Sequence, residues 1–286
     1  MIFRLNVTRI PWVLLLLWRG AAPFTPTLTG IRRDASSILK SSSTADNSNI
    51  KDDMLNGHRQ VVKTIKSILF DNLYAGTTVD RSYARFYALE TIARMPYFAY
   101  TSVLHFLETT GKWRQADRLA LHFAETWNEL HHLLIMEELL TQSKNPTQDK
   151  IPFRDRFVAQ HVAFFYFWFA VGLYLVRPDA AYSLNQAVEE EAYATYDAFL
   201  KEHEDYLKSQ PAPEVAINYY NGSGQDMFDR MSKTLLIGKI DCATSSRRVE
   251  CKTLYDCFVA IRDDELEHSQ TMELLKQEPF ELDQSG

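Results

Sequence analysis

The chain has 286 residues, a length that fits one large domain or two small ones. Its 31 Lys and Arg residues against 37 Asp and Glu residues give a formal net charge of -6, so it lacks the basic footprint of a nucleic-acid-binding protein. A hydrophobic fraction of 46% excludes a mainly disordered chain, and only 10 Gly and 10 Pro argue against a turn-rich all-β fold. The cysteines (Cys242, Cys251 and Cys257) are odd in number, which excludes a disulfide-stapled scaffold.

The first 50 residues have the composition of targeting signals. Arg4 and Arg9 precede an apolar run at 11–18 that is too short to cross a bilayer, a pattern typical of a signal peptide. A Ser-rich, basic stretch at 31–49 follows and is typical of a transit peptide. We therefore expect residues 1–50 to be a bipartite signal and transit leader and residues 51–286 to form one domain. A simple signal peptide followed by a linker is the alternative.

Helical periodicity dominates the rest of the chain, and no strand pattern interrupts it, so an all-α fold is expected. Pro96 is expected to kink or divide a long helix, and Asp179 is a candidate N-cap. A polar loop at 141–152 and an irregular stretch at 209–250 separate some of the helices. The expected long helices are 51–73, 81–108, 113–140, 153–176, 179–207 and 252–276.

Two Glu-x-x-His pairs stand out, Glu129 with His132 and Glu265 with His268, and each pair shares one helix face. None of the other six histidines, which include His105 and His122, has a Glu three residues before it, so we expect them to be structural or exposed. A carboxylate-bridged di-iron site in a helical bundle takes such a pair from each of two helices and a single Glu from each of two others.

Two long helices offer the single carboxylates. Glu90 lies in an apolar run, where a charge needs a partner or a metal, and Glu189 opens a Glu triplet on a Tyr-rich helix. The set of four Glu and two His suits iron or manganese. Asn128 and Asp264 each precede a candidate ligand and are expected to orient the ligands by hydrogen bonds. The pattern therefore predicts a ferritin-like four-helix bundle with a metal centre, made of Glu90, Glu129, His132, Glu189, Glu265 and His268.

Four sequence words resemble the alternative oxidase superfamily and, within it, its plastid terminal oxidase branch. They are RFYALETIARMPYFAY at 85–100, NELHH at 128–132, APEVAINYY at 212–220 and LYDCFVAIRDDELEH at 254–268. The resemblance covers about 81–272 and places the iron ligands of the family on the same six residues. It implies a quinol:oxygen oxidoreductase that oxidises plastoquinol and reduces dioxygen to water at a centre of two iron ions, without pumping protons.

The resemblance also implies roles for residues that spacing alone does not single out. Tyr196 matches the catalytic redox tyrosine of the family. The quinone-binding positions match Arg85, Leu89, Ala192 and Thr195. It further implies a plastid location at the thylakoid membrane, and a homodimer is a further expectation.

One departure keeps other functions open. Glu190 and Glu191 stand where plastid forms usually have Ser and His, and they resemble the mitochondrial form. A mitochondrial-type ubiquinol alternative oxidase is therefore the first alternative. Another carboxylate di-iron enzyme, such as a desaturase or quinone hydroxylase, is the second. A ferritin-like iron store would not need the apolar surplus described next.

The segment 157–176 is long and apolar enough to span a membrane. A single crossing there would place Glu129 and His132 on one side of the bilayer and the later ligands on the other, so one metal site could not form. We therefore expect a monotopic protein whose apolar face lies on the membrane. The arginines expected to meet lipid headgroups are Arg81, Arg85, Arg94, Arg154, Arg156 and Arg177.

Overall fold

The computed structural model describes residues 36–71, 74, 78–112, 114–142, 153–222 and 250–277. The predicted signal segment, most of the loop at 141–152 and Cys242 lie outside these residues. The chain divides into two compact units, Met1–Asn56 and Gly57–Gly286. The description below concerns the second unit.

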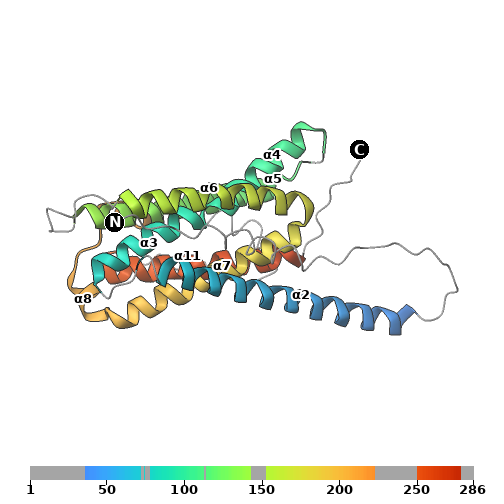
Figure 1. Ribbon diagram of the computed structural model, residues 1–286, viewed down its shortest axis with the longest axis horizontal. Helices are drawn as coiled ribbons and strands as arrows, with labels where there is room; N and C mark the ends of the chain where they lie inside the picture. Colours follow the sequence, from blue (N-terminus) through green and yellow to red (C-terminus); the bar gives the residue numbers. More distant parts are fainter. Residues whose placement is uncertain are drawn as a thin grey trace, which may run out of the picture. The chain divides into compact units, whose positions relative to one another are not determined.

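Most of the described residues are helical, which confirms the all-α prediction. Their only β-type pairing is an isolated bridge between Pro211 and Thr253. The helices, in chain order, are α2 (Ser36–Lys66), α3 (Val79–Ala93), α4 (Met95–Thr109), α5 (Ala116–Gln142), α6 (Phe153–Val176), α7 (Pro178–Glu202), α8 (Glu204–Ser209), α9 (Glu214–Tyr220) and α11 (Leu254–Gln277), with one π-helical turn at Ser67–Asp71 (Figure 1).

The breaks between helices follow from local chemistry. Pro96 lacks a backbone N–H and therefore cannot continue the hydrogen-bond ladder of α3, so the chain breaks at Arg94 and Pro96 lies in the first turn of α4. At the other end of α4, Gly111 takes a left-handed conformation with φ of 84°, and the N–H of Lys112 donates to the carbonyl of Leu107 at 3.0 Å.

Some boundaries differ from the sequence expectations. The first helix begins at Ser36, within the range predicted to be a leader, and this observation does not test whether the leader is removed. The helix expected over 179–207 is divided into α7 and α8 at His203. Asp179 is not the N-cap, because Pro178 occupies the first turn and the carboxylate of Asp179 instead pairs with Arg177 at 2.9 Å.

Four helices, α3, α5, α7 and α11, enclose the centre of the bundle, and α7 packs along α11 while α6 packs on α3 and α4 (Figure 1). Two apolar clusters fill its interior. The first cluster contains the residues before Glu90 on α3 and those after His132 on α5. The second contains residues such as Tyr97, Tyr100 and Met272, which lie on the other side of the candidate ligands. The predicted metal site therefore lies between two apolar clusters along the bundle.

Candidate metal centre

The structure brings all six candidate ligands together in the interior, and each of their side chains is 0% exposed. They form two groups within which the ligand atoms lie less than 4.8 Å apart. The shared members are Glu129 and Glu265, so these two carboxylates can bridge two metal positions. The groups are Glu90, Glu129, His132 and Glu265, and Glu129, Glu189, Glu265 and His268.

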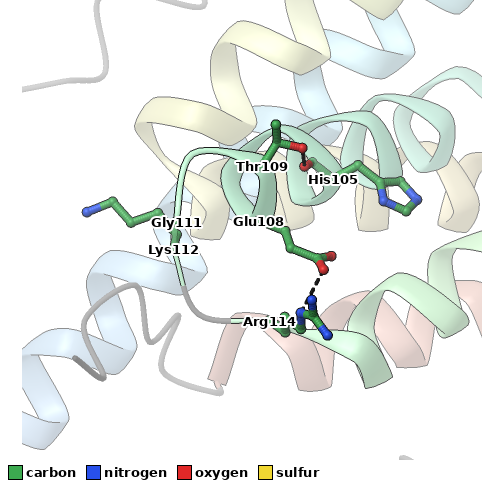
Figure 2. A pocket seen from close by; sticks show the side chains of 6 residues that line it. All are labelled: His105, Glu108, Thr109, Gly111, Lys112 and Arg114. Atoms are coloured by element: carbon green, nitrogen blue, oxygen red, sulfur yellow. Dashed lines mark hydrogen bonds and ion pairs between the residues drawn. The ribbon is translucent and has the colours of Figure 1, made fainter. Parts of the chain in front are cut away.

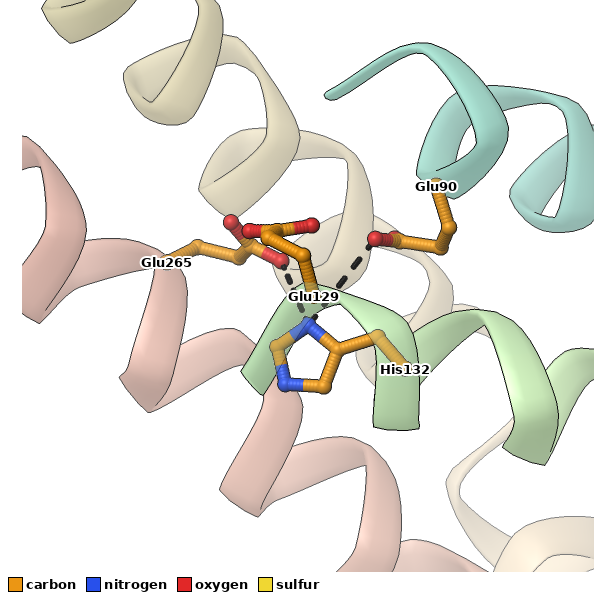
Figure 3. A group of neighbouring side chains, drawn as sticks. All are labelled: Glu90, Glu129, His132 and Glu265. Atoms are coloured by element: carbon orange, nitrogen blue, oxygen red, sulfur yellow. Dashed lines mark ion pairs between the residues drawn. The ribbon is translucent and has the colours of Figure 1, made fainter. Parts of the chain in front are cut away.

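The two Glu-x-x-His pairs interlock. The Nδ1 atom of His132 lies 3.3 Å from Oε1 of Glu265 and 3.8 Å from Oε2 of Glu90 (Figure 3). The Nδ1 atom of His268 lies 2.9 Å from Oε1 of Glu129 and 3.6 Å from Oε2 of Glu265. Among these glutamates, each histidine is therefore closest to the carboxylate of the other pair, which two facing helices require and sequence spacing does not reveal.

The polar atoms of this cluster fit a metal site. Both carboxylate oxygens of Glu129 and of Glu265 and one oxygen each of Glu90 and Glu189 have no hydrogen-bond partner within the described part of the chain. Burying such groups is costly unless a cation or donor compensates them. Four carboxylates match the charge of two divalent cations, and the carboxylate and imidazole set is the one that iron and manganese prefer.

The pKa values of the buried glutamates shift in opposite directions, because some lie closest to other carboxylates and one lies between two imidazoles. Burial, together with the neighbouring carboxylates Glu129 and Glu265, raises the pKa of Glu90 well above its ordinary value. Burial, together with Glu265 and Glu129, likewise raises the pKa of Glu189. For Glu265, burial is outweighed by the imidazoles of His132 and His268, which lower its pKa. The negative charge of the cluster thus needs positive charge from protons or metal ions.

A hydrogen-bond network orients His132. Its Nε2 donates to Oδ2 of Asp264 at 3.1 Å, which leaves Nδ1 facing the glutamates. Oδ2 of Asp264 also accepts from Asn128 Nδ2 at 3.0 Å and from the Tyr220 hydroxyl at 2.9 Å, and Asn128 donates to the Tyr219 hydroxyl at 2.8 Å. An acceptor behind a ligating histidine sets its tautomer and raises its basicity.

Helix α9 positions the two tyrosines of this network. The carboxylate of Glu138, on α5, accepts the backbone N–H groups of Glu214 at 3.0 Å and Val215 at 2.9 Å. These donors at the start of α9 have no partner within the helix, so Glu138 both satisfies them and complements the helix dipole. The contact holds α9 against α5 and places Tyr219 and Tyr220 beside Asp264.

Two buried tyrosines bind the carboxylates that come from the single-Glu helices. The hydroxyl of Tyr196, on α7, donates to Oε1 of Glu90, on α3. The hydroxyl of Tyr97, on α4, donates to Oε1 of Glu189 at 2.7 Å. Each contact leaves the Oε2 atom of its carboxylate without a protein donor among the described residues. Tyr196 therefore contacts a candidate ligand, and Tyr97 makes the equivalent contact on the other side of the site, which sequence spacing did not single out.

Comparisons with known proteins agree with this geometry. A family model described as "Alternative oxidase" matches residues 36–277. The chain belongs to the alternative oxidase family. It is 49% identical over 204 residues to "Ubiquinol oxidase 4, chloroplastic/chromoplastic" of Arabidopsis thaliana, which covers 71% of this chain and 53% of that protein. It is 34% identical over 138 residues to "Ubiquinol oxidase, mitochondrial" of Mangifera indica, covering 46% of this chain and 39% of that one. The chain therefore spans about half the length, or less, of these relatives.

The predicted quinone-binding residues lie on two neighbouring helices, Arg85 and Leu89 on α3 and Ala192 and Thr195 on α7. Ala192 is buried, whereas the other three are partly exposed. The hydroxyl of Thr195 donates to the backbone carbonyl of Glu191 at 2.7 Å.

Glu190 and Glu191, where the sequence differs from the usual plastid form, pair with basic residues of α2. The guanidinium of Arg59, on α2, forms two hydrogen bonds with Glu190, at 2.6 and 2.8 Å, and Lys66 pairs with Glu191. Sequence reasoning did not foresee these pairs, because they join residues more than 120 positions apart. They place two acidic residues of α7 against a basic face of α2 rather than in the metal site.

A surface hollow lies apart from the metal site, at the turn between α4 and α5 (Figure 2). Glu108 pairs with Arg114 at 2.7 Å across it. None of the six candidate ligands lines the hollow, whose lining residues are His105, Glu108, Thr109, Gly111, Lys112 and Arg114.

Proposed function

We propose that this chain is a quinol:oxygen oxidoreductase, a terminal oxidase that oxidises plastoquinol and reduces dioxygen to water without pumping protons. The observation that supports it most directly is the pair of interlocked carboxylate and histidine groups sharing Glu129 and Glu265. Membership of the alternative oxidase family and the greater identity to the chloroplastic relative favour the plastid branch.

In this proposal the six buried residues hold two iron ions. Glu90, Glu129, His132 and Glu265 would hold one ion, and Glu129, Glu189, Glu265 and His268 would hold the other, so Glu129 and Glu265 would serve both. When bound, the iron ions supply the redox chemistry by which four electrons, taken from two quinols, reduce one dioxygen molecule to two water molecules.

The protein's own groups orient the ligands and handle protons. Asp264 holds the proton of His132 on Nε2, so the Nδ1 lone pair is available to a metal. Tyr196, the proposed catalytic tyrosine, holds its proton at a hydroxyl bonded to Glu90 and stacks on Phe86 with ring centroids 4.3 Å apart. Complete burial keeps bulk water away and strengthens each of these interactions.

Quinol would bind between α3 and α7, next to Glu90 and Glu189. Arg85 is the donor proposed for a quinone oxygen, Thr195 is a second polar contact, and Leu89 and Ala192 supply apolar surface. Because Thr195 donates to its own helix in this structure, its hydroxyl would have to rotate, or accept a hydrogen bond, to contact a quinone.

The membrane surface is the proposed source of quinol. Among the described residues, α6 is the helix long and apolar enough to cross a membrane, yet only 22% of its most apolar window is buried. The adjacent helix α4 adds exposed Phe98, whose ring lies 5.2 Å from that of Phe167. We infer that this face lies on the bilayer, because α6 connects α5 to α7 and both of these helices contribute to one site.

The proposal also includes the location of the protein, its domain limits and its oligomeric state. The chloroplastic relative supports a plastid location, at the thylakoid membrane, and the signals predicted in residues 1–50 would direct the chain there. The domain limits, 1–50 for the leader and 51–286 for the oxidase, and a homodimer remain predictions.

Oxygen consumption by the purified, iron-loaded protein tests the proposal. We expect cyanide-resistant, gallate-sensitive oxygen uptake with a plastoquinol analogue. Protein that holds two irons but consumes no oxygen with any quinol would contradict it.

The second candidate, a mitochondrial-type ubiquinol oxidase, is favoured by Glu190 and Glu191 alone. The same assay separates the two candidates when plastoquinol and ubiquinol analogues with identical short tails are compared. A higher kcat/KM for the ubiquinol analogue would support the second candidate.

A further inference from the structure

A second set of buried polar residues lies next to the metal site and has no role in the mechanism above. It contains four tyrosines, a histidine and a glutamate, and all six are at most 1% exposed. The tyrosines belong to the second apolar cluster, so the set lies in an apolar interior. Its members are Tyr97, Tyr100, Tyr174, Tyr182, His122 and Glu125.

The tyrosine rings form a continuous series that begins at the metal site. Tyr97 contacts Glu189, and its ring lies 5.5 Å from that of His268. The ring of Tyr100 lies 6.3 Å from that of Tyr97 and 5.3 Å from that of Tyr182. Electron transfer through a protein slows steeply with distance, so short ring-to-ring steps form a favourable path.

The far end of the series is built to release a proton. Arg118 lies 3.4 Å and the Tyr174 hydroxyl 2.6 Å from the Tyr182 hydroxyl, and both can donate to it. Its own proton is then directed at Nε2 of His122, at 3.0 Å. The opposite ring nitrogen of His122 lies 2.8 Å from Oε2 of Glu125, which therefore accepts the Nδ1 proton.

We propose that this set is a redox relay in which Tyr182 is a second redox-active tyrosine, and the proposal rests on the proposed function. The oxidant is the iron centre after its reaction with dioxygen. Tyr182 gives one electron to it through the rings of Tyr100 and Tyr97, and its phenolic proton moves to Nε2 of His122. The products are a neutral tyrosyl radical and an imidazolium whose charge Glu125 balances.

Return of one electron along the same rings and of the proton from His122 restores the starting state. The relay would hold an oxidising equivalent away from the metal ligands when no quinol is bound. At rest the phenol is protonated, because burial raises the pKa of Tyr182 to about 12. Oxidation makes a phenol strongly acidic, so the adjacent imidazole is the group that takes its proton.

Electron paramagnetic resonance tests the relay. Reduced, iron-loaded full-length protein is mixed with dioxygen in the absence of quinol and frozen at successive times, with ring-deuterated tyrosine identifying tyrosyl signals. We expect a tyrosyl component that is lost in Tyr182→Phe and reduced in His122→Gln. The matched control is Tyr83→Phe, which removes another buried tyrosine hydroxyl outside the series and should leave the signal unchanged.

Two further measurements separate the possible outcomes. In metal-free protein, nitrogen NMR should place the proton of His122 on Nδ1, and Tyr182→Phe should shift the Nε2 resonance. If Tyr182→Phe does not fold, 3,5-difluorotyrosine at this position should instead split the radical signal.

A wild-type enzyme that oxidises quinol but whose tyrosyl signal is the same in Tyr182→Phe would overturn the relay and leave the function intact. Absence of quinol-dependent oxygen uptake by the wild type would overturn the function, and the relay with it.

Discussion

The interior of the bundle and the outer face of α6 depart from the usual distribution of side chains in opposite directions. Inside, the four glutamates of the candidate metal site are 0% exposed, whereas on α6 Phe165 is 67% and Trp168 is 59% exposed. Buried carboxylates need compensating positive charge, and a large exposed apolar patch marks an interaction surface, with a membrane as one of the partners that fit it. In the proposed function each region therefore has a partner that the chain itself does not supply: iron ions inside and lipid outside.

This comparison makes the two regions separable by mutation, and the largest effect is expected inside. Glu129→Ala or His268→Ala should abolish iron binding and oxygen uptake together, because each removes a ligand from a set of six. Binding to vesicles should be unchanged. Iron content and oxygen uptake are measured beside Glu204→Ala, a surface control on α8. Loss of activity with two irons still bound would show that the ligand assignment is wrong.

The complementary change replaces exposed aromatic side chains on the outer face of α6 and leaves the metal site intact. A triple variant, Phe164→Ser with Phe165→Ser and Trp168→Ser, should weaken binding to anionic lipid vesicles by roughly 1000-fold or more, since burying one such side chain contributes about 1.5 to 3 kcal/mol. Iron content should stay at the wild-type level. Vesicle sedimentation measures binding, with Ile217→Ser, on α9, as the exposed apolar control. Protease-protected fragments on both sides of sealed vesicles would refute the monotopic arrangement.

An intermediate effect on iron binding is expected from Asp264, which contacts the candidate ligand His132. Asp264→Asn removes the charged acceptor that holds His132, and such changes typically lower metal affinity or activity by about 10 to 100-fold. The adjacent Asp263, which pairs with Arg262, provides the control Asp263→Asn. Iron affinity is measured by competition with a chelator. Equal affinities in the two variants would mean that Asp264 does not orient the ligand.

The smallest effect concerns a titrating side chain outside both regions. Burial, with a contribution from Lys276, lowers the pKa of His58 to about 4, and its Nδ1 lies 3.0 Å from the Ser183 hydroxyl. The folded state therefore binds fewer protons than the unfolded state between pH 6.5 and 4, so stability falls as the pH falls through this window. The slope is at most about 1.4 kcal/mol per pH unit.

Replacement of His58 by Asn should flatten this part of the profile. Denaturant unfolding at a series of pH values measures it, with exposed His161→Asn as the control. A profile that keeps its full slope in the His58 variant would assign the pH dependence to other groups.

Much of the site could be predicted because its information is local. The spacing of Glu129 to His132 and of Glu265 to His268 puts each pair on one face of one helix. What escaped prediction joins residues far apart in the chain. Tyr97 reaches Glu189 across 92 positions, and Arg59 reaches Glu190 across 131. His122 showed no signal in the sequence, because its partners are a carboxylate that follows it and a tyrosine on another helix.

The sequence by itself determined that this protein is helical, that one long helix breaks next to Pro96, and which six residues form the candidate metal site, because helix periodicity, Pro96 and the Glu-x-x-His spacing are local properties. Only the tertiary structure decided that Glu129 and Glu265 belong to both groups, that each histidine lies closest to the other pair's carboxylate, and that Asp264 lies behind His132. The physical reason is that bridging and orientation depend on how facing helices pack, and that packing is set by the apolar clusters on either side of the site.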